Sequence, residues 1–312
     1  MSNWIEALPE LEGQLSRDRP LADLCWLRVG GAAQVLFQPA HMDDISTLMK
    51  ALPKDVPVLP IGVCSNLIVR DGGVDGVVIR PGSAFGGFEV LQDGTVRVGA
   101  GLLDAMTANK ASQAGKDLSF LRTIPGSLGG AVKMNAGCYG RYMADVFVRA
   151  TAVDRDGNVV TLTKDDMNFG YRASAVPDDM VIVQAVLNPP EGETAKIAEV
   201  MKANMAMRLE SQPVGKLSAG STFRNPSGAS ATGAPNEDHA QSAWKVIDQA
   251  GCRGETVGGA QMSETHANFM INADGATATD LENLGELVRK KVYENSGISL
   301  EWEIRRVGKP AP

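Results

Sequence analysis

The stretch IPGSLGGAVKMNAG, residues 124–137, says more about the fold of this 312-residue chain than any other. Glycine exposes backbone N–H groups with no side chain in the way, and the serine and asparagine of this stretch add side-chain donors. Such a loop can wrap a flat ring system or a diphosphate, although its spacing alone also fits an irregular structural connection. Its candidate ligand-binding residues are Gly126, Ser127, Gly129, Gly130, Asn135 and Gly137.

A second loop with the same potential lies earlier, in PIGVCSNLIVRDGG at residues 60–73. It follows an apolar segment typical of a strand and offers small and polar residues in a turn. Taken alone, it fits a bare turn as well as a binding loop. Its candidate ligand-binding residues are Gly62, Ser65, Asn66 and Leu67.

A third glycine-containing turn, in TVRVGAGLLDAMTANKA at residues 95–111, imitates a dinucleotide-binding βα turn. It has the order strand, Gly-x-Gly and helix, but Asp104 occupies the third glycine position. A side chain there would crowd the turn and place negative charge beside a pyrophosphate. We therefore interpret this segment as a structural turn.

Composition and charge argue against several classes of protein. A hydrophobic fraction of 44% with 21% charged residues is ordinary for a globular chain, and no apolar run is long enough for a membrane span. The net charge of −7 opposes electrostatic attraction to nucleic acid or to anionic membranes, so we expect small-molecule partners. Four dispersed cysteines and three histidines favour neither disulfides nor a metal site. We expect a cytoplasmic monomer.

Hydrophobic periodicity predicts short strands interspersed with helices, and hence an α/β fold with mixed sheets (α+β). The clearest strand signal is the continuous apolar run over 180–187, which suits a buried position. The clearest helix signal covers 280–295, where Thr279 and Glu282 fit a capping box. Further strands are predicted over 56–62, 67–70, 76–80, 148–154 and 268–272, and further helices over 43–52, 103–114, 193–209 and 242–250.

A change of composition near residue 190 predicts two domains. The first would cover 1–190 and the second, smaller one 191–308. The first begins with a polar leader over residues 1–20 that has some helical character. Residues 226–243 are small and polar, and we interpret them as a tolerated insertion rather than a mobile lid.

Several residues of the second half suit anion binding or acid–base chemistry. Arg172 lies in FGYRAS, at residues 169–174. Its guanidinium group is always charged and can donate two parallel hydrogen bonds to a carboxylate. Ser221 lies among small residues in AGSTFRNP, residues 219–226, where its hydroxyl could face a ligand. On sequence alone, the arginine also fits a surface charge and the serine a turn residue. Further candidates are Tyr171, Lys216, Arg224 and Asn225.

Taken in this order, the motifs resemble the UDP-N-acetylenolpyruvoylglucosamine reductase family. The resemblance rests on the two glycine loops, on FGYRAS and AGSTFRNP, on WLRVGG at residues 26–31 and on EWEIRRVG at 301–308. It implies an FAD-binding fold of the vanillyl-alcohol-oxidase type with a smaller C-terminal substrate domain. The FAD-binding region would have two lobes, of about 20–80 and 81–190. It also implies an NADPH-dependent flavoenzyme that converts UDP-N-acetylglucosamine enolpyruvate to UDP-N-acetylmuramate in peptidoglycan synthesis. Neither glycine loop contains a histidine for covalent attachment, so we expect non-covalent FAD.

The resemblance also implies roles for the candidates. Hydride would pass from flavin N5 to substrate C3, Arg172 and Glu303 would stabilise the enolate, and Ser221 would protonate C2. Lys216 would be a nearby cation or a diphosphate ligand. Glu303 is favoured over Glu301 because EIR matches the EVR pattern of the family.

The chain departs from the family pattern in two respects, and two other functions compete with the implied one. Cys64 stands where a glycine is usual in the GxGSN turn, and the chain resembles the shorter variant that lacks an extra tyrosine-bearing loop. The main alternative is an FAD-dependent sugar or hydroxy-acid oxidase of the same fold, reoxidised by oxygen and indifferent to NADPH. The other is a nucleotide-sugar-binding protein without catalysis.

Overall fold

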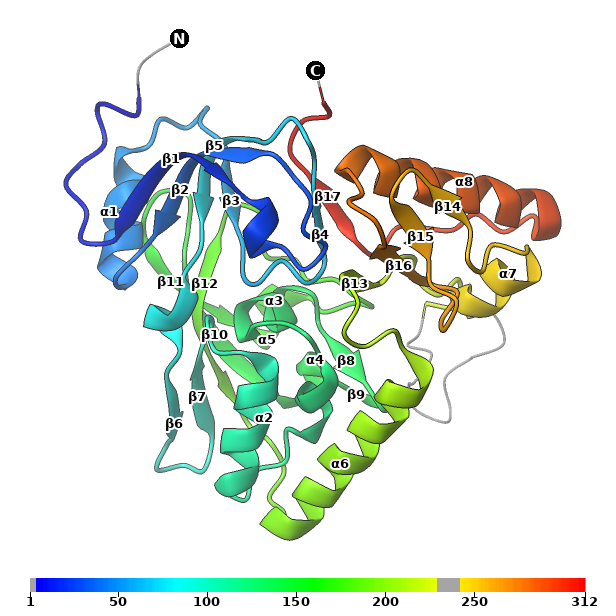
Figure 1. Ribbon diagram of the computed structural model, residues 1–312. Coiled ribbons are helices and arrows are strands. Elements are labelled where there is room, and N and C mark those ends of the chain that lie inside the picture. Colours follow the sequence, from blue (N-terminus) through cyan, green and yellow to red (C-terminus); the bar gives the residue numbers. More distant parts are fainter. Residues whose placement is uncertain (1–3, 229–241, 312) are drawn as a thin grey trace.

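The N-terminal strands form a four-stranded sheet with one helix packed on it, in the computed structural model that describes residues 4–228 and 242–311 (Figure 1). The sheet order is β1-β2-β5-β3; β1 is antiparallel to β2, whereas β2 and β3 are parallel to β5. Apolar residues of β2, β5 and α1 share one core. The bounds are β1 Gln14–Pro20, β2 Ala32–Gln38, α1 Met42–Ala51, β3 Val58–Pro60 and β5 Val74–Ile79.

The second sheet is antiparallel, with the order β11-β10-β12-β7-β6. Its β12 (Val181–Leu187) is apolar on both faces. Val181 and Val183 belong to the core of the first sheet, whereas Ile182 and Leu187 belong to the core that the second sheet forms with its helices. The remaining strands are β6 Phe88–Val90, β7 Val96–Gly99, β10 Phe147–Val153 and β11 Val159–Thr163. The helices here are α2 Asp104–Gln113, η3 Ser119–Thr123, α3 Leu128–Lys133, α4 Met143–Val146, α5 Lys164–Met167 and α6 Thr194–Ser211.

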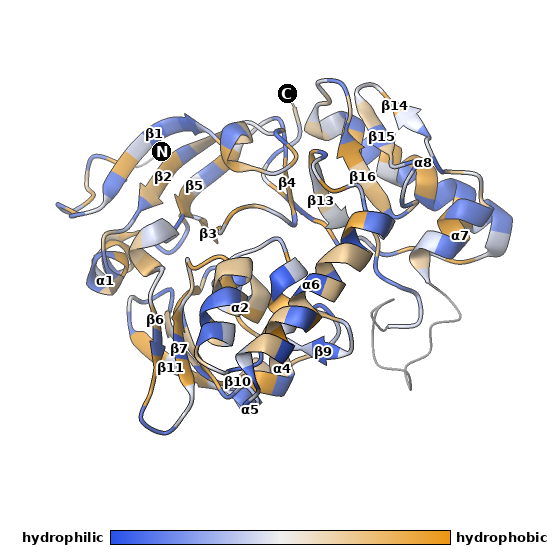
Figure 2. Cartoon of the chain, turned by 60° about the horizontal axis from the view of Figure 1, so that its bottom comes forward, coloured by the Kyte–Doolittle hydropathy of each residue, from blue (hydrophilic) through white to orange (hydrophobic). Residues whose placement is uncertain are grey.

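The third sheet has the order β13-β16-β15-β14 and carries two helices (Figure 1). Its core combines Met262 and Met270 of the sheet with Leu281, Leu284 and Val288 of α8. The hydropathy colouring of Figure 2 shows apolar residues along β16 and polar ones on the outer side of α8. The bounds are β13 Ser218–Ser221, α7 Ala243–Gln249, β14 Thr256–Val257, β15 Ala260–Met262, β16 Phe269–Asn272 and α8 Ala278–Ser296.

The last strand returns to the beginning of the chain. β17 (Arg305–Val307) pairs in parallel with β4 (Leu67–Val69), with Arg305 opposite Leu67. The pair lies between the first and third sheets (Figure 1). The C-terminal segment therefore reaches the loop that precedes β4, which is the first of the two predicted glycine loops.

Three local predictions need correction. The leader contains a strand, β1, rather than helical structure, because its polar residues form an edge strand that pairs with β2. Helix α8 begins at Ala278, and its capping box is made by Thr277 and Asp280; Thr279 and Glu282 instead contact Asp71 and Arg70. Glu303 precedes β17 instead of lying within a strand.

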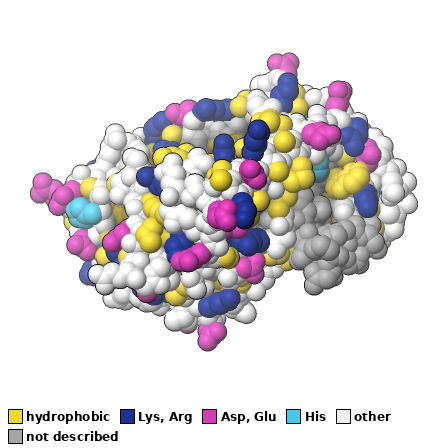
Figure 3. Space-filling model, turned by 90° about the horizontal axis from the view of Figure 1, so that it is seen from below, with side chains coloured by type: hydrophobic (Ala, Val, Ile, Leu, Met, Phe, Trp, Pro, Cys, Tyr) yellow, Lys and Arg dark blue, Asp and Glu magenta, His cyan; other side chains and the backbone are white. Residues whose placement is uncertain are grey.

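The predicted domain boundary near residue 190 falls between β12 and α6, and it stays our interpretation. Most of the predicted insertion at 226–243 lies outside the described residues. Within the described residues, no helix has the length and apolar character needed to cross a membrane. The face seen in Figure 3 carries acidic and basic side chains interspersed.

Candidate active site

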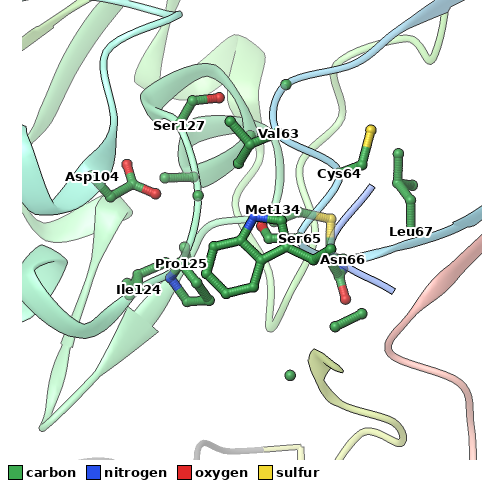
Figure 4. Close-up of a pocket in the computed structure, with 18 of the residues that line it drawn as sticks. Val63, Cys64, Ser65, Asn66, Leu67, Asp104, Ile124, Pro125, Ser127 and Met134 are labelled. Atoms are coloured by element: carbon green, nitrogen blue, oxygen red, sulfur yellow. The ribbon is translucent and has the colours of Figure 1, made fainter. Parts of the chain in front are cut away.

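A cavity of about 930 Å³ brings together most of the residues predicted from the sequence. It is lined by both glycine loops, the start of α2, the end of α6, β13 and the segment before β17. Figure 4 shows residues of the two loops together with Asp104 of α2. The predicted residues that line it are Gly62, Ser65, Asn66, Leu67, Gly126, Ser127, Gly129, Gly130, Gly137, Arg172, Lys216, Ser221 and Glu303. The predicted residues that do not line it are Asn135, Tyr171, Arg224 and Asn225.

Each glycine loop has a glycine at a close contact: Gly62 faces the second loop, and Gly126 faces the start of α2. A Cβ atom at Gly62 would collide with the Ser127 hydroxyl, and one at Gly126 would collide with the Asp104 carboxyl. Gly130, by contrast, has open space where a side chain would be, so a ligand can approach its backbone. The sequence could not distinguish these two uses of glycine.

The first loop is held by side chains on both sides of it. Arg80 Nε donates to the Gly62 carbonyl at 3.3 Å. Asn66 Nδ2 donates to the Glu303 carbonyl at 3.2 Å, and the Asn66 carbonyl accepts from the Arg305 N–H at 3.1 Å. Asn66 therefore fixes the C-terminal segment next to the loop. Cys64 has φ of 52°, in the left-handed region that favours glycine.

The second loop opens α3, and part of its backbone is already engaged. The Leu128 and Gly129 N–H groups donate to the carbonyls of Leu102 and Ala100, both at 2.9 Å. Asn135 donates to the Gly170 carbonyl and accepts from the Ala144 N–H, each at 2.9 Å. Its side chain thus links the loop to the turn that carries Arg172.

The turn before α2 is more than a structural turn, because Gly101 and Asp104 line the cavity. The Asp104 side chain is fully buried, and neither carboxyl oxygen has a hydrogen-bond partner in the part of the chain that the structure describes. Burial raises the pKa of Asp104 well above its ordinary value, which favours the neutral acid. The negative charge that the sequence suggested at this position is therefore suppressed.

Arg172 and Glu303 form a half-buried ion pair at the cavity, with Nε 2.9 Å from Oε1. Burial opposes the charge of Arg172, but Glu303 and Tyr171 outweigh it and raise the pKa of the guanidinium. Its Nη1 atom is buried and has no partner among the described residues. A buried donor without an acceptor suits an anionic ligand group.

Ser221 ends β13 at the cavity wall, opposite Phe269 of β16. The next residue, Thr222, accepts at its carbonyl from the Glu303 N–H at 2.8 Å. This bond places the serine hydroxyl and the glutamate carboxylate on neighbouring backbone. Lys216 lines the same cavity in the exposed turn before β13.

The predicted residues outside the cavity lining lie close behind it. The Arg172 guanidinium carbon lies 5.1 Å from the centre of the Tyr171 ring, and burial with the nearby Glu303 raises the pKa of Tyr171 to about 12. The Asn225 side chain accepts from the Ala243 N–H at 2.9 Å. The Arg224 N–H donates to the Glu301 carbonyl at 2.8 Å, so this segment supports the strand end that carries Ser221.

Sequence reasoning missed several cations of the cavity. Lys133 and Arg305 both pair with Asp178, at 3.0 and 2.8 Å. Arg208, at the end of α6, donates to the Thr123 carbonyl, and its Nε has no partner in the described part of the chain. Lys133 lies inside the second glycine loop and Arg305 follows Glu303, so proximity to these motifs was the available signal.

These residues fit an FAD molecule. The glycine cradle around Gly130 is open, Ser65 and Ser127 offer hydroxyls, and the arginines and Lys133 offer positive charge to a diphosphate. The unpartnered buried atoms at Arg172, Arg208 and Ser218 all belong to residues that line the cavity. Residues 33–163 match the FAD binding domain family. The chain is therefore a flavoprotein with an FAD-binding fold of the vanillyl-alcohol-oxidase type.

Residues 212–307 match the C-terminal domain of UDP-N-acetylenolpyruvoylglucosamine reductase. The chain is 56% identical over 300 residues to the reductase of that name from Ruegeria pomeroyi, covering 96% of this chain and 97% of the relative. It is 53% identical over 305 residues to that of Paracoccus denitrificans, covering 98% and 99%. The crystal structure of the Thermus caldophilus reductase superposes with a TM-score of 0.79 at 30% identity, covering 96% of this chain and all of that one.

The chain belongs to the UDP-N-acetylenolpyruvoylglucosamine reductase family. This confirms the resemblance seen in the motifs, the mixed α/β fold and the FAD-binding class. The protein is an NADPH-using flavoprotein oxidoreductase of peptidoglycan precursor synthesis.

Proposed function

We propose that the protein reduces UDP-N-acetylglucosamine enolpyruvate to UDP-N-acetylmuramate in the 930 Å³ cavity. The observation that carries the proposal is the ion pair of Arg172 and Glu303 beside Ser221, all three lining one cavity with the two glycine loops. FAD bound there, without a covalent link, would take hydride from NADPH and deliver it from N5 to C3 of the enolpyruvyl group. Gly62, Ser65, Asn66 and Leu67 on one side, and the second loop on the other, would hold it.

Arg172 would bind the enolpyruvyl carboxylate through its unpartnered Nη1. Negative charge grows on this carboxylate when hydride adds to C3, and a preorganised guanidinium in a half-buried site stabilises that charge more than water does. Glu303 holds the guanidinium in place through Nε. It also keeps the arginine paired before substrate arrives, which lowers the cost of the buried charge.

Ser221 would donate its Oγ proton to C2 of the substrate. A hydroxyl is a weak acid, but the enolate carbon is a strong base. The proton transfer is therefore feasible when a nearby cation stabilises the serine alkoxide that it leaves. Lys216 is our candidate for that cation or for a diphosphate ligand. Tyr171, Arg224 and Asn225 would support substrate binding from behind the cavity wall.

One cavity for NADPH and the nucleotide-sugar supports alternate use by the two substrates, and hence ping-pong kinetics. We also propose a cytoplasmic monomer with domains of 1–190 and 191–308, the second carrying Ser221 and returning Glu303 to the first. The oxidase alternative differs in one measurable respect, because it would return electrons to oxygen.

The decisive experiment follows the flavin absorption of the anaerobic holoenzyme. NADPH should bleach the band, and the enolpyruvyl nucleotide-sugar should restore it. In Ser221→Ala, bleaching by NADPH should be preserved and restoration by the second substrate should fall by at least a factor of 100, which is the scale of a lost acid catalyst. Ser211→Ala, which removes an exposed hydroxyl that donates to the Met207 carbonyl, is the matched control.

Survival of both half-reactions in Ser221→Ala would show that this serine is not the acid. A wild-type band that only oxygen restores would instead support the oxidase.

A further inference from the structure

Two thiols meet at the cavity, and the proposed reduction uses neither of them. Cys25 directly follows the short helix η1 (Ala22–Leu24), and Cys64 lies in the first glycine loop. Both residues belong to one buried cluster, both line the cavity, and they are only 2% and 4% exposed. The two thiols are near enough for each to affect the pKa of the other. Figure 4 shows Cys64 within the loop that also carries Ser65 and Asn66.

We propose that Cys25 and Cys64 form an oxidisable dithiol, a modification site at which hydrogen peroxide or another small peroxide converts the two thiols into a disulfide. The sequence separates these residues widely and gives no CxxC motif, so only the fold brings them together. The site depends on these contacts and on no step of the proposed reduction.

The surroundings assign different roles to the two sulfurs. The contact with Cys64 lowers the pKa of Cys25, although burial opposes this shift. The same contact and burial raise the pKa of Cys64 well above its usual value. Arg28 and Arg80 also favour the thiolate of Cys25, whereas Asp23 disfavours it. Cys25 is therefore the better nucleophile, and Cys64 keeps the proton.

The oxidation balances with one peroxide molecule. The Cys25 thiolate attacks one peroxide oxygen, the O–O bond breaks, and after protonation a sulfenic acid and one water result. The Cys64 sulfur then attacks the Cys25 sulfur, forming the S–S bond and releasing the hydroxyl group as a second water. Two thiols lose two electrons and two protons, and the peroxide gains them. Peroxide is also what a reduced flavin releases when it meets oxygen, so the oxidant can arise within the same cavity.

The other two cysteines provide internal controls. The Cys138 thiol donates to the Phe120 carbonyl at 3.1 Å, and the Cys252 thiol donates to the Ala250 carbonyl at 3.7 Å. Burial raises the pKa of both thiols. Neither has the thiol contact that distinguishes Cys25, so we expect both to react slowly.

The test treats the aerobic holoenzyme with hydrogen peroxide, blocks free thiols and identifies tryptic peptides by mass spectrometry without reduction. We expect a cross-link between peptides 18–28 and 55–70 to appear at least ten times faster than any oxidation of Cys138 or Cys252. Dithiothreitol should return both peptides to the thiol form. Equal oxidation rates at all four cysteines, or the absence of this cross-link while the others oxidise, would overturn the proposal.

Two conservative variants test the order of events. In Cys64→Ser, the sulfenic acid on Cys25 has no resolving thiol and should be trapped by dimedone. In Cys25→Ser, Cys64 should stay a thiol at the same peroxide concentration. Dimedone labelling of Cys64 instead of Cys25 would refute the assigned roles. All readouts are chemical, so a failure of the proposed reduction would leave them unaffected.

Discussion

At the scale of single residues, several non-glycine residues that line the cavity have left-handed backbone, among them Cys64 and Arg172. Cys64 has φ of 52° and Arg172 has φ of 53°. This conformation costs an ordinary residue on the order of 1 kcal/mol, so surrounding contacts must hold it. At Cys64 it gives the physical reason why the family pattern has glycine there. At Arg172 it belongs to the turn from which the guanidinium reaches Glu303.

The burial of Asp104 predicts how the free energy of unfolding depends on pH. Burial raises the pKa of its carboxyl well above the ordinary value in the folded chain, whereas the unfolded chain ionises at about 3.9. Folding then requires proton uptake, so the free energy of unfolding falls as pH rises above that value, by roughly 1 kcal/mol per pH unit until the folded pKa is reached. Asp104→Asn removes this loss. We expect the variant to exceed wild type in urea-unfolding stability at pH 7 and the difference to shrink toward pH 4.

Asp44 supplies the matched control for this prediction. It is also buried, but its carboxylate accepts the N–H groups of Glu12, Gly13 and Ala40 at 3.1, 2.8 and 3.0 Å. Asp44→Asn should therefore destabilise the protein, by about 1–3 kcal/mol. Equal pH slopes for wild type and Asp104→Asn would show that Asp104 is ionised in the folded protein.

Sequence reasoning could select Arg172, Ser221 and Glu303 only through the resemblance, since their residue types are common on any surface. It placed them in one site, and the fold brings all three to one cavity. It did not assign Cys25 or Asp104 to the cavity, because nothing in a linear pattern reports which distant side chains a fold buries together. The roles of the candidates stay predictions.

At the scale of elements, helix α8 positions the C-terminal part of the site through one aromatic ring. Trp302 packs on Phe223 with ring centres 5.2 Å apart, and its indole N–H donates to Glu286 of α8 at 2.9 Å. The ring fills the space beside Gly285, where a Cβ atom would overlap it. Trp302 is the neighbour of Glu303, so the helix controls where that carboxylate lies.

Gly285→Ala tests this arrangement. Alanine has the better helix propensity by about 1 kcal/mol, but the forced shift of the indole should cost about 1–3 kcal/mol and displace Glu303. We expect a net loss of stability in urea unfolding and a slower reoxidation of reduced flavin by the nucleotide-sugar, with FAD content unchanged. Asn283→Ala, at an exposed position of the same helix, should change neither quantity. A more stable Gly285→Ala variant would mean that the ring has room to move.

Elements with strong periodicity were predicted well, and those without it were not. The apolar run at 180–187 became β12, because that strand is covered on both faces. Strand β1 was missed because its residues are mostly polar, as is typical of an edge strand, and among the described strands it pairs with β2 alone. The start of α8 was displaced by two residues because Thr277 and Thr279 are each followed by an acidic residue three positions later.

At the scale of the whole molecule, a short pair of parallel strands holds the C-terminal segment next to the first glycine loop. β17 pairs with β4, and Arg305 and Lys309 add ion pairs to Asp178 and Asp75, both at 2.8 Å. Periodicity cannot predict such a pairing, because both strands are three residues long and lie far apart in the sequence.

A chain that ends at Ile304 should therefore lose function out of proportion to its length. We expect at least a 100-fold drop in the second half-reaction, because Glu303 would no longer be anchored through Arg305 to Asn66, and about 2–4 kcal/mol less stability. Stopped-flow flavin reoxidation and urea unfolding measure the two effects. A chain that ends at Pro310 keeps β17 and should behave as wild type. Full activity of the shorter chain would show that β17 does not position Glu303.

The return of the last strand to the first glycine loop also has a consequence for biosynthesis. A ribosome completes both glycine loops and the first two sheets long before it adds Glu303 and β17, so the nascent chain can fold its cofactor-binding part first. The glutamate that completes the ion pair with Arg172 arrives only when translation is nearly finished. A polypeptide released early would thus be able to take up flavin but not to process the nucleotide-sugar.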